Sequence, residues 1–220
     1  MGEGERGSED RRVSAKVIGL TGPIGAGKTT VAGILRELGA KVLDADALVR
    51  DEQSRGTLGY TAIVQTFGTA ILGPDKEIDR KKLADEVFAD PQKLARLERI
   101  LHPRVIARIL EARKMLHDGD VLVVEAIKLL ESGLRSVCDE VWVVMAPRES
   151  MFERLEKRGL SRPEVELRWR NQYSEEQYRG AADVVIDNSL DRDQLKARVR
   201  AEWARLATTV ARGRGPSPGP

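Results

Sequence analysis

The chain has 220 residues, of which 37 are Lys or Arg and 35 are Asp or Glu, so its formal net charge is only +2. That balance excludes the strong single-sign field that drives non-specific nucleic-acid binding. A hydrophobic fraction of 41% excludes wholesale disorder at this length, and an aromatic fraction of 4% disfavours a base-stacking surface. The single cysteine, Cys138, excludes an internal disulfide and suits a reducing compartment.

The two ends of the chain carry little that could be buried. Residues 1–13 are polar and acid-rich, without the basic start and apolar stretch of a secretory signal, and the last residues are rich in proline and glycine. We therefore expect disordered ends at 1–13 and 209–220, with one domain over 14–208. No apolar run approaches the roughly 20 residues of a membrane span. The expectation is a soluble, cytoplasmic protein without membrane contact.

Between the ends, short β-branched runs alternate with amphipathic stretches. Strands are predicted at 17–21, 41–44, 121–125, 140–146 and 183–187, and helices at 28–37, 129–133, 149–158 and 192–206. The strands are apolar almost throughout, which is typical of a parallel sheet buried on both faces. The alternation predicts an α/β fold, namely a three-layer α/β/α sandwich with a mostly parallel five-stranded sheet.

Two helical stretches interrupt this alternation. Residues 45–119 show helical periodicity with no convincing strand, and His102-Pro103 is expected to divide them, because proline disfavours helix in the residue before it. Residues 148–180 are again helical and very rich in arginine. We expect an α/β core that carries two helical insertions.

The strongest motif is GPIGAGKT at 22–29, which follows the first predicted strand and precedes the first predicted helix. It matches G-x-x-x-x-G-K-[ST], the phosphate-binding loop of P-loop proteins. The backbone N–H groups of such a loop and the following helix start hold phosphate oxygens. Lys28 would reach the β- and γ-phosphates, Thr29 would bind Mg²⁺, and Thr30 would contact the α-phosphate. The motif predicts binding of a nucleoside triphosphate and leaves the reaction open.

Among the classes of protein that contain this loop, other features of the sequence favour a small-molecule kinase. The sequence has no Asn-Lys-x-Asp motif of a GTPase, and the third predicted strand ends with Glu125 rather than the Asp-Glu pair of motor-type ATPases. Asp44 and Asp46 end the second predicted strand, at the sheet edge where ligands gather. Either carboxylate could cap the next helix or act as a general base, and it is equally open that one residue does each of these jobs.

The arginine-rich stretch supplies candidate cations over the phosphates. Arg154 and Arg158 are spaced i, i+4 and share one helical face. Arginine grips phosphate in a bidentate way that lysine does not reproduce. Most of the other arginines at 148–180 fit a solvated surface, because glutamates nearly neutralise them.

Over residues 16–206 the sequence resembles the dephospho-CoA kinase family. The resemblance is carried by IGLTGPIGAGKTTVAGILRELGAKVLDADALVR at 18–50, LERILHP at 97–103, ESG at 131–133, ERLEKRGLS at 153–161, Gln172, and ADVVIDNS at 182–189. It implies transfer of the γ-phosphoryl group of ATP, with Mg²⁺, to the ribose 3′-hydroxyl of dephospho-CoA.

The resemblance also implies roles for individual residues. Asp46 would be the general base, Lys28 and Thr29 would bind the γ-phosphate and Mg²⁺, and Arg154 would be the catalytic lid arginine, with Arg158 and Arg168 as further lid candidates. The insertion at 45–119 would bind the acceptor and 148–180 would form the lid. The expected ATP-binding residues are Gly22, Gly25, Ala26, Gly27, Lys28, Thr29, Thr30, Arg154 and Arg158. The expected acceptor-binding residues are Asp44, Arg80, His102 and Leu129, although a packed histidine at a helix break is an equal alternative for His102.

One segment departs from the family pattern. Where the family usually reads Ile-Pro-Leu-Leu-x-Glu-Ser, this chain reads IKLLES at 127–132, with a lysine for the proline and one residue fewer. Lys128 would either add a phosphate contact or face solvent. Two other functions remain open: a kinase of another nucleoside, nucleotide or small alcohol, and a nucleotide-dependent switch or scaffold. The expected partners are ATP and dephospho-CoA, with no nucleic acid, for a monomer or weak homo-oligomer.

Overall fold

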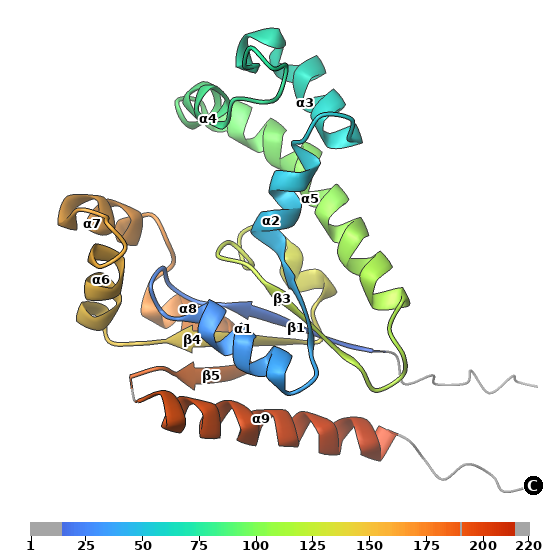
Figure 1. Ribbon diagram of the computed structural model, residues 1–220, viewed down its shortest axis with the longest axis vertical. Helices are drawn as coiled ribbons and strands as arrows, with labels where there is room; N and C mark the ends of the chain where they lie inside the picture. The colour runs from blue at the N-terminus through green and yellow to red at the C-terminus, as the bar shows by residue number, and fades with distance from the viewer. Residues whose placement is uncertain (1–14, 190, 214–220) are drawn as a thin grey trace, which may run out of the picture.

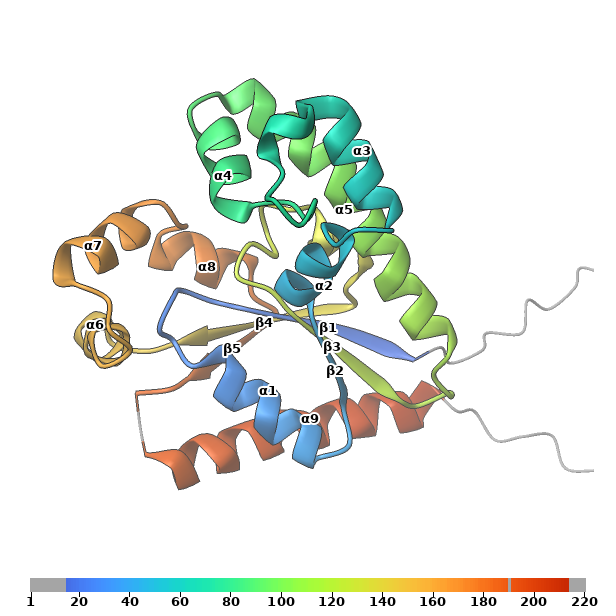
Figure 2. The same ribbon diagram turned by 45° about the horizontal axis from the view of Figure 1, so that its top comes forward.

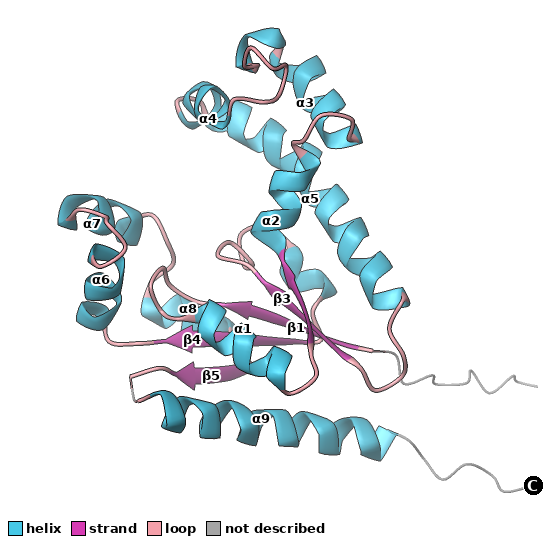
Figure 3. Ribbon diagram, in the orientation of Figure 1, coloured by secondary structure: helices cyan, strands magenta, loops and turns pink. Residues whose placement is uncertain are grey.

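The computed structural model describes residues 15–189 and 191–213, and its centre is a five-stranded parallel sheet (Figures 1 and 3). The strands are β1 (Lys16–Thr21), β2 (Lys41–Asp44), β3 (Val121–Glu125), β4 (Glu140–Met145) and β5 (Val184–Asp187). They lie in the order β2-β3-β1-β4-β5, and every neighbouring pair is parallel. The predicted parallel sheet is confirmed.

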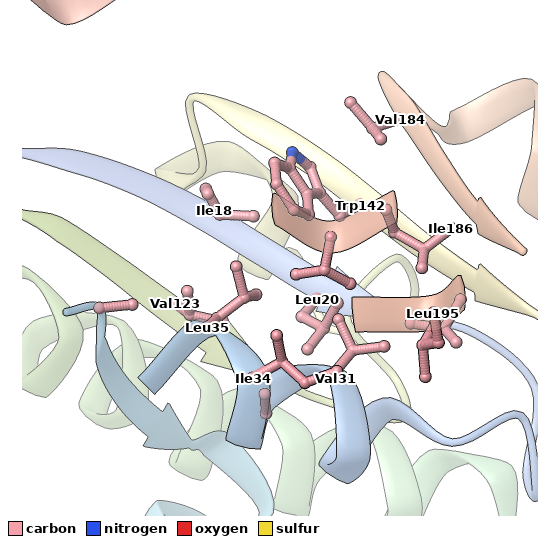
Figure 4. Packing of buried hydrophobic residues seen from close by; sticks show 14 of the residues in the cluster. Ile18, Leu20, Val31, Ile34, Leu35, Val123, Trp142, Val184, Ile186 and Leu195 are labelled. Atoms are coloured by element: carbon pink, nitrogen blue, oxygen red, sulfur yellow. The ribbon is translucent and has the colours of Figure 1, made fainter. Parts of the chain in front are cut away.

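Helices cover both faces of this sheet, as the predicted three-layer sandwich requires. Alternate side chains of a strand point to opposite faces, so Val17 of β1 packs on one face while Ile18 and Leu20 pack on the other. The Ile18 face is covered by α1 (Lys28–Glu37) and α9 (Arg192–Gly213), and Figure 4 shows Leu35 and Leu195 against it. Each such fully buried aliphatic side chain contributes about 1.5–3 kcal/mol.

The insertion predicted at 45–119 forms a helical subdomain with a core of its own. It contains α2 (Ala45–Glu52), α3 (Leu58–Phe67), the short 3₁₀ helix η1 (Thr69–Ile71), α4 (Arg80–Phe88) and α5 (Pro91–Lys114). Ile63, Leu83 and Leu101 belong to its separate hydrophobic cluster. In Figure 1, α3 and α4 stand above the sheet, and α2 and α5 connect them to it.

The predicted break at His102-Pro103 is wrong, because α5 runs without interruption from Pro91 to Lys114. Proline inside a helix costs about 3 kcal/mol, since its ring removes one N–H donor and crowds the preceding turn. Packing on both sides of the proline offsets this cost. Before it, Leu97 and Leu101 join the core of the insertion, and after it, Val105 and Ile109 join the cluster on the second face of the sheet.

The stretch predicted to form the lid, residues 148–180, contains three helices in the structure. It begins with α6 (Arg148–Glu156) and α7 (Arg162–Arg170), which stand beside the sheet in Figure 2 and share a small cluster around Phe152 and Val165. The next helix, α8 (Glu175–Ala181), buries Tyr178 completely in the cluster on the second face of the sheet. This helix is therefore anchored to the core, and the pair α6–α7 is the lid candidate.

Two further boundaries are corrected. The helix predicted at 129–133 is a single turn, closed by a hydrogen bond from Ser132 N to Lys128 O of 2.9 Å and followed by Gly133 at φ 75° and the 3₁₀ helix η2 (Leu134–Val137). The helix predicted at 192–206 is longer than expected, because α9 continues to Gly213. The expected disorder at 1–13 and 214–220 lies outside the described residues. Within the described part, no helix is both long and apolar enough to cross a membrane.

Candidate active site

The phosphate-binding motif forms the turn between β1 and α1, at the carboxyl end of the sheet. Gly27 is the N-cap of α1, with φ 99°, and a Cβ there would lie 2.2 Å from Asn188 Nδ2. Gly22 has φ 143°, and a Cβ there would lie 2.2 Å from Val144 O. The left-handed φ and the close approach of β4 and Asn188 explain why these positions require glycine.

Lys28 lies buried beneath this loop. Its Nζ donates to the carbonyl oxygens of Gly22 at 2.8 Å and Pro23 at 3.0 Å. Burial lowers the pKa of Lys28 to about 8, although the nearby carboxylates of Glu125 and Asp46 act in the opposite direction. An ammonium that is poorly solvated gains strongly from an anion, so this environment suits a phosphate ligand.

Thr29, the next residue, contacts a carboxylate from a different strand. Its hydroxyl donates to Glu125 Oε1 at 2.8 Å. Glu125 ends β3, where it pairs in register with Leu20 of β1 and Asp44 of β2. Glu125 could not be assigned to the site from the sequence, because the order of strands along the chain does not show that β3 lies between β1 and β2. Its only signal was a carboxylate at the end of a predicted strand.

Asp44 and Asp46 have different surroundings. Asp44 is the N-cap of α2, since its side chain accepts from Ala47 N at 3.0 Å, and it forms an ion pair with Arg50 at 3.4 Å. Asp46 lies in the first turn of α2 and is half-buried. Burial, and then the charge of Asp44, raise the pKa of Asp46, while a backbone hydrogen bond from Ile127 lowers it. The capping role therefore falls to Asp44, which leaves Asp46 available for chemistry.

Asp46 lines two separate hollows, each of about 200 Å³. The first, which we call the phosphate hollow, lies over the loop, and six predicted ATP ligands line it: Gly25, Gly27, Lys28, Thr29, Thr30 and Arg158. The second, the insertion hollow, lies between the helical subdomain and the sheet and is lined by α2, α5 and the turn after β3. A single half-buried carboxylate thus faces both a phosphate site and a second compartment.

The insertion hollow brings together some of the predicted acceptor residues. His102 of α5 and Lys128 both line it, among apolar neighbours that include Leu97, Leu101 and Val105. Ser132 lines it too, and its Oγ is buried without a hydrogen-bond partner among the described residues. Leu129 is different: its exposed fraction is 0%, and it packs over Gly19 in the core. In this structure Leu129 offers no surface to an acceptor.

Arg80 lines a third hollow of about 470 Å³, which we call the outer hollow, together with Arg50 and Lys81. Gln53 lines both the outer and the insertion hollow, while Arg50 lines both the outer and the phosphate hollow. Because Asp46, Arg50 and the C-cap residue Gln53 are spaced four and three residues apart, they lie along one face of α2 and its C-terminal end. That face connects all three hollows.

The predicted lid arginines lie in different places. Arg154 of α6 donates to the loop carbonyls of Gly25 and Ala26, both at 3.3 Å, so its guanidinium supports the backbone of the loop. Arg158 lines the phosphate hollow, whereas Arg168 is exposed on α7. Asn188 follows a predicted strand, and nothing in the sequence around it indicates a role at the loop. Its buried Nδ2 donates to Ala26 O at 2.7 Å and braces the loop from β5.

The oxygen atoms around Thr29 suit a hard divalent cation. Within residues 15–189 and 191–213, no three His, Cys, Asp or Glu side chains group closely enough to hold a metal ion on their own. Mg²⁺ is usually held by one or two protein oxygens and the phosphates of its nucleotide. The Thr29 hydroxyl, with Glu125 hydrogen-bonded to it, fits that pattern.

Comparison with known proteins identifies relatives over most of the chain. A family model described as dephospho-CoA kinase matches residues 16–194. A dephospho-CoA kinase of Aquifex aeolicus is 44% identical over 191 residues, covering 87% of this chain and 97% of that protein. One of Thermobifida fusca is 42% identical over 190 residues, covering 86% and 95%.

Solved structures agree with this result. The protein TT1252 of Thermus thermophilus has a TM-score of 0.77 at 35% identity, covering 88% of this chain and 98% of that one. A dephospho-CoA kinase from Campylobacter jejuni has a TM-score of 0.66 at 26% identity, with the same coverage. A shikimate kinase from Bacteroides thetaiotaomicron, at 16% identity and a TM-score of 0.52, shares the fold. The P-loop kinase fold is thus confirmed, and this chain belongs to the dephospho-CoA kinase family.

Proposed function

We propose that this protein transfers the γ-phosphoryl group of ATP to the ribose 3′-hydroxyl of dephospho-CoA, the step that completes coenzyme A. The observation that carries the proposal is the position of Asp46, which lines both the phosphate hollow and the insertion hollow. A base at that junction can take the proton of an acceptor hydroxyl while the hydroxyl oxygen faces a bound nucleotide.

Phosphoryl transfer asks the protein mainly for positioning and charge stabilisation. The loop N–H groups and Lys28 hold the phosphates, and the ammonium of Lys28 balances negative charge that develops on them. Arg158 adds a second cation in the same hollow. Arg154 contributes by holding the loop carbonyls, and closure of α6–α7 would bring both arginines nearer the nucleotide.

Asp46 has the properties of a general base in this scheme. Burial and the charge of Asp44 raise the pKa of Asp46. The carboxylate therefore binds a proton more readily, as a general base that works near neutral pH must. When the acceptor hydroxyl attacks the γ-phosphorus, its proton passes to the Asp46 carboxylate and the β–γ bridging bond breaks, leaving ADP. Arg50, held by Asp44, stands on the same face of α2 and steadies the charge around this carboxylate.

Mg²⁺ is proposed as the accompanying ion, with Thr29 and Glu125 as its nearest protein groups. When bound, the ion supplies neutralisation of charge across the β- and γ-phosphates. The role of this chain is to keep the Thr29 hydroxyl at the mouth of the loop, which the hydrogen bond to Glu125 achieves.

The acceptor is proposed to occupy the insertion and outer hollows. The apolar wall and His102 of the insertion hollow suit a nucleoside, and Lys128 stands at its rim with an exposed side chain. In the outer hollow, Arg50, Arg80 and Lys81 suit the diphosphate of dephospho-CoA, because arginine pairs with phosphate in a bidentate way. Asp44 takes part indirectly, through its ion pair with Arg50.

We propose further that the protein works in the cytoplasm on small molecules, as a monomer or weak homo-oligomer without nucleic acid. The near-zero net charge argues against a nucleic-acid partner. The lone cysteine, Cys138, is buried, as suits a reducing compartment.

The test is an assay of the purified chain with ATP, Mg²⁺ and dephospho-CoA, in which the product is separated and its phosphorylation site is determined. The proposal predicts coenzyme A phosphorylated at the 3′-position, and no product when EDTA removes Mg²⁺. Turnover of a nucleoside, nucleotide or simple alcohol without turnover of dephospho-CoA would contradict it. So would tight nucleotide binding without transfer to any acceptor, the result expected of a switch.

A further inference from the structure

We propose that Gln172 is a positioning residue for nucleotide binding, which acts by holding the phosphate loop through the backbone N–H of Ile24. The carboxamide Oε1 of Gln172 accepts from Ile24 N at 2.9 Å. Gln172 lies in the turn between α7 and α8, so this bond joins the segment after α7 to the loop after β1. The proposed kinase function enters only in the choice of ATP as the nucleotide.

Gln172 differs from the other side chains that support this loop. Lys28, Arg154 and Asn188 all donate to loop carbonyl oxygens. Gln172 instead accepts from a loop N–H. Such a loop binds phosphate through N–H groups that a strained backbone turns inward, so its shape depends on where each peptide unit is fixed. Gln172 fixes the peptide unit between Pro23 and Ile24, one residue before Gly25, whose own φ is 82°.

The amide nitrogen of the same carboxamide shows that holding this orientation costs stability. Nε2 of Gln172 is buried and has no hydrogen-bond partner among the described residues. A buried amide donor without a partner destabilises the folded chain, because the group has lost its hydrogen bonds to water. Turning the carboxamide over would place Nε2 against Ile24 N–H, two donors facing each other, so the orientation is dictated by the loop. Filling space in the turn would not require a polar side chain here, and we infer that the acceptor oxygen is what the position requires.

Ile24 also connects the loop to the lid pair by its side chain. It packs against the cluster of Phe152, Leu155 and Val165 within α6–α7. The same residue lines the phosphate hollow beside Lys28 and Thr29, and it is absent from the lining of the insertion hollow. Loss of the Gln172 bond should therefore weaken nucleotide binding and leave acceptor binding unchanged.

The test uses Gln172→Met, which keeps the length of the side chain and removes the acceptor. In the nucleotide-free protein, the hydrogen exchange of the Ile24 amide, followed by NMR, should become about tenfold faster. The Kd for ATP should rise about 3- to 10-fold, the fold-change expected when one net hydrogen bond is lost. The kcat at saturating ATP and the KM for the acceptor should stay within about twofold of wild type. Asn171→Ala, an exposed neighbour in the same turn, is the matched control and should match wild type in all four quantities.

Gln172→Glu separates the acceptor oxygen from the amide as a whole. Its carboxylate can still accept from Ile24 N–H, so the Ile24 amide should exchange as slowly as in wild type, even though the added charge repels ATP. This variant decides the matter alone if Gln172→Met does not fold: slow exchange supports the proposal and fast exchange overturns it.

The proposal is also overturned if Gln172→Met leaves the Ile24 amide and the Kd for ATP unchanged, or if it raises the KM for the acceptor as much as the Kd for ATP. Amide exchange and ATP binding need no acceptor. These two readouts therefore keep their meaning if dephospho-CoA proves not to be the substrate, and the two failures can be told apart.

Discussion

Replacing Gly27 by alanine is a sharp test of how the phosphate loop is built. Gly27 has φ 99°, and a Cβ added there would lie 2.2 Å from Asn188 Nδ2, which donates to Ala26 O. The substitution therefore places an alanine in the left-handed region and pushes Asn188 away from the loop. Both consequences should appear in the stability of the chain and in nucleotide binding.

The magnitude follows from these two terms. A non-glycine residue in the left-handed region costs about 1–2 kcal/mol. Breaking the buried bond of Asn188 costs about 1–3 kcal/mol, because its buried amide loses its partner, while the carbonyl of Ala26 keeps only Arg154. Gly27→Ala should thus lower the free energy of unfolding by about 2–5 kcal/mol. At about 2–4 °C per kcal/mol for a domain of this size, the Tm should fall by about 4–20 °C.

The assay is urea unfolding and calorimetry of ATP binding, with a matched glycine as control. Gly33 lies inside α1, and a Cβ there would meet nothing within 4 Å, so Gly33→Ala should stabilise the chain by about 0.5–1 kcal/mol. In an Asn188→Ala background, Gly27→Ala should cost only the backbone term, so the two changes should not add. Equal stability of Gly27→Ala and wild type, or full additivity with Asn188→Ala, would refute the reasoning.

Two further predictions concern Lys28 and Arg80. Since burial holds the pKa of Lys28 at about 8 in the folded chain against 10.5 in the unfolded one, the folded state binds fewer protons between those values, and stability should rise with pH across that window. The gain in the free energy of unfolding should reach up to about 3 kcal/mol and should be absent in Lys28→Met. Denaturant unfolding of both chains at pH 8 and pH 10 measures this difference. An equal pH dependence of stability in the two chains would contradict the prediction. Arg80→Ala should raise the KM for dephospho-CoA by about tenfold or more, because it removes a charge-assisted bond to phosphate, without changing the KM for ATP. Arg96→Ala, exposed on the same subdomain, is its control, and a change in the KM for ATP alone would contradict the assignment of the outer hollow.

The sequence alone predicted those parts of the molecule that depend on local patterns. Apart from β2, which is charged at both ends, the strands are mostly apolar runs. The motif at 22–29 combines a strand, a glycine-rich turn and a helix start within a few residues. For the same reason the helix predicted at 28–37 agrees with α1 at both ends. Local rules failed where long-range packing opposes them. Pro103 should end a helix, yet α5 continues through it, because its two halves pack into two separate hydrophobic clusters.

The site was predictable in its composition more than in its arrangement. Asp44 and Asp46 could not be told apart from their spacing, because the assignment depends on where α2 begins and which carboxylate reaches Ala47 N. Glu125 reaches Thr29 only because β3 lies between β1 and β2, and Asn188 reaches Ala26 only because β5 ends behind the loop. Such contacts join residues far apart in the chain, so strand order must be known before they can be seen.

The central claim is that Asp46 is the base that serves both hollows, and the most direct measurement is the kcat of Asp46→Asn at saturating ATP and dephospho-CoA. Asp44→Asn is the matched control: asparagine caps a helix as well as aspartate, so its kcat at neutral pH should stay within a few-fold. The negative charge of Asp44 raises the pKa of Asp46. Asp44→Asn removes that charge, so it should lower the pKa of Asp46 and move the acid limb of the pH profile to lower pH. For Asp46→Asn we expect kcat to fall about 100-fold or more, with the Kd for ATP within about twofold of wild type. Turnover of Asp46→Asn at the wild-type rate would contradict the account.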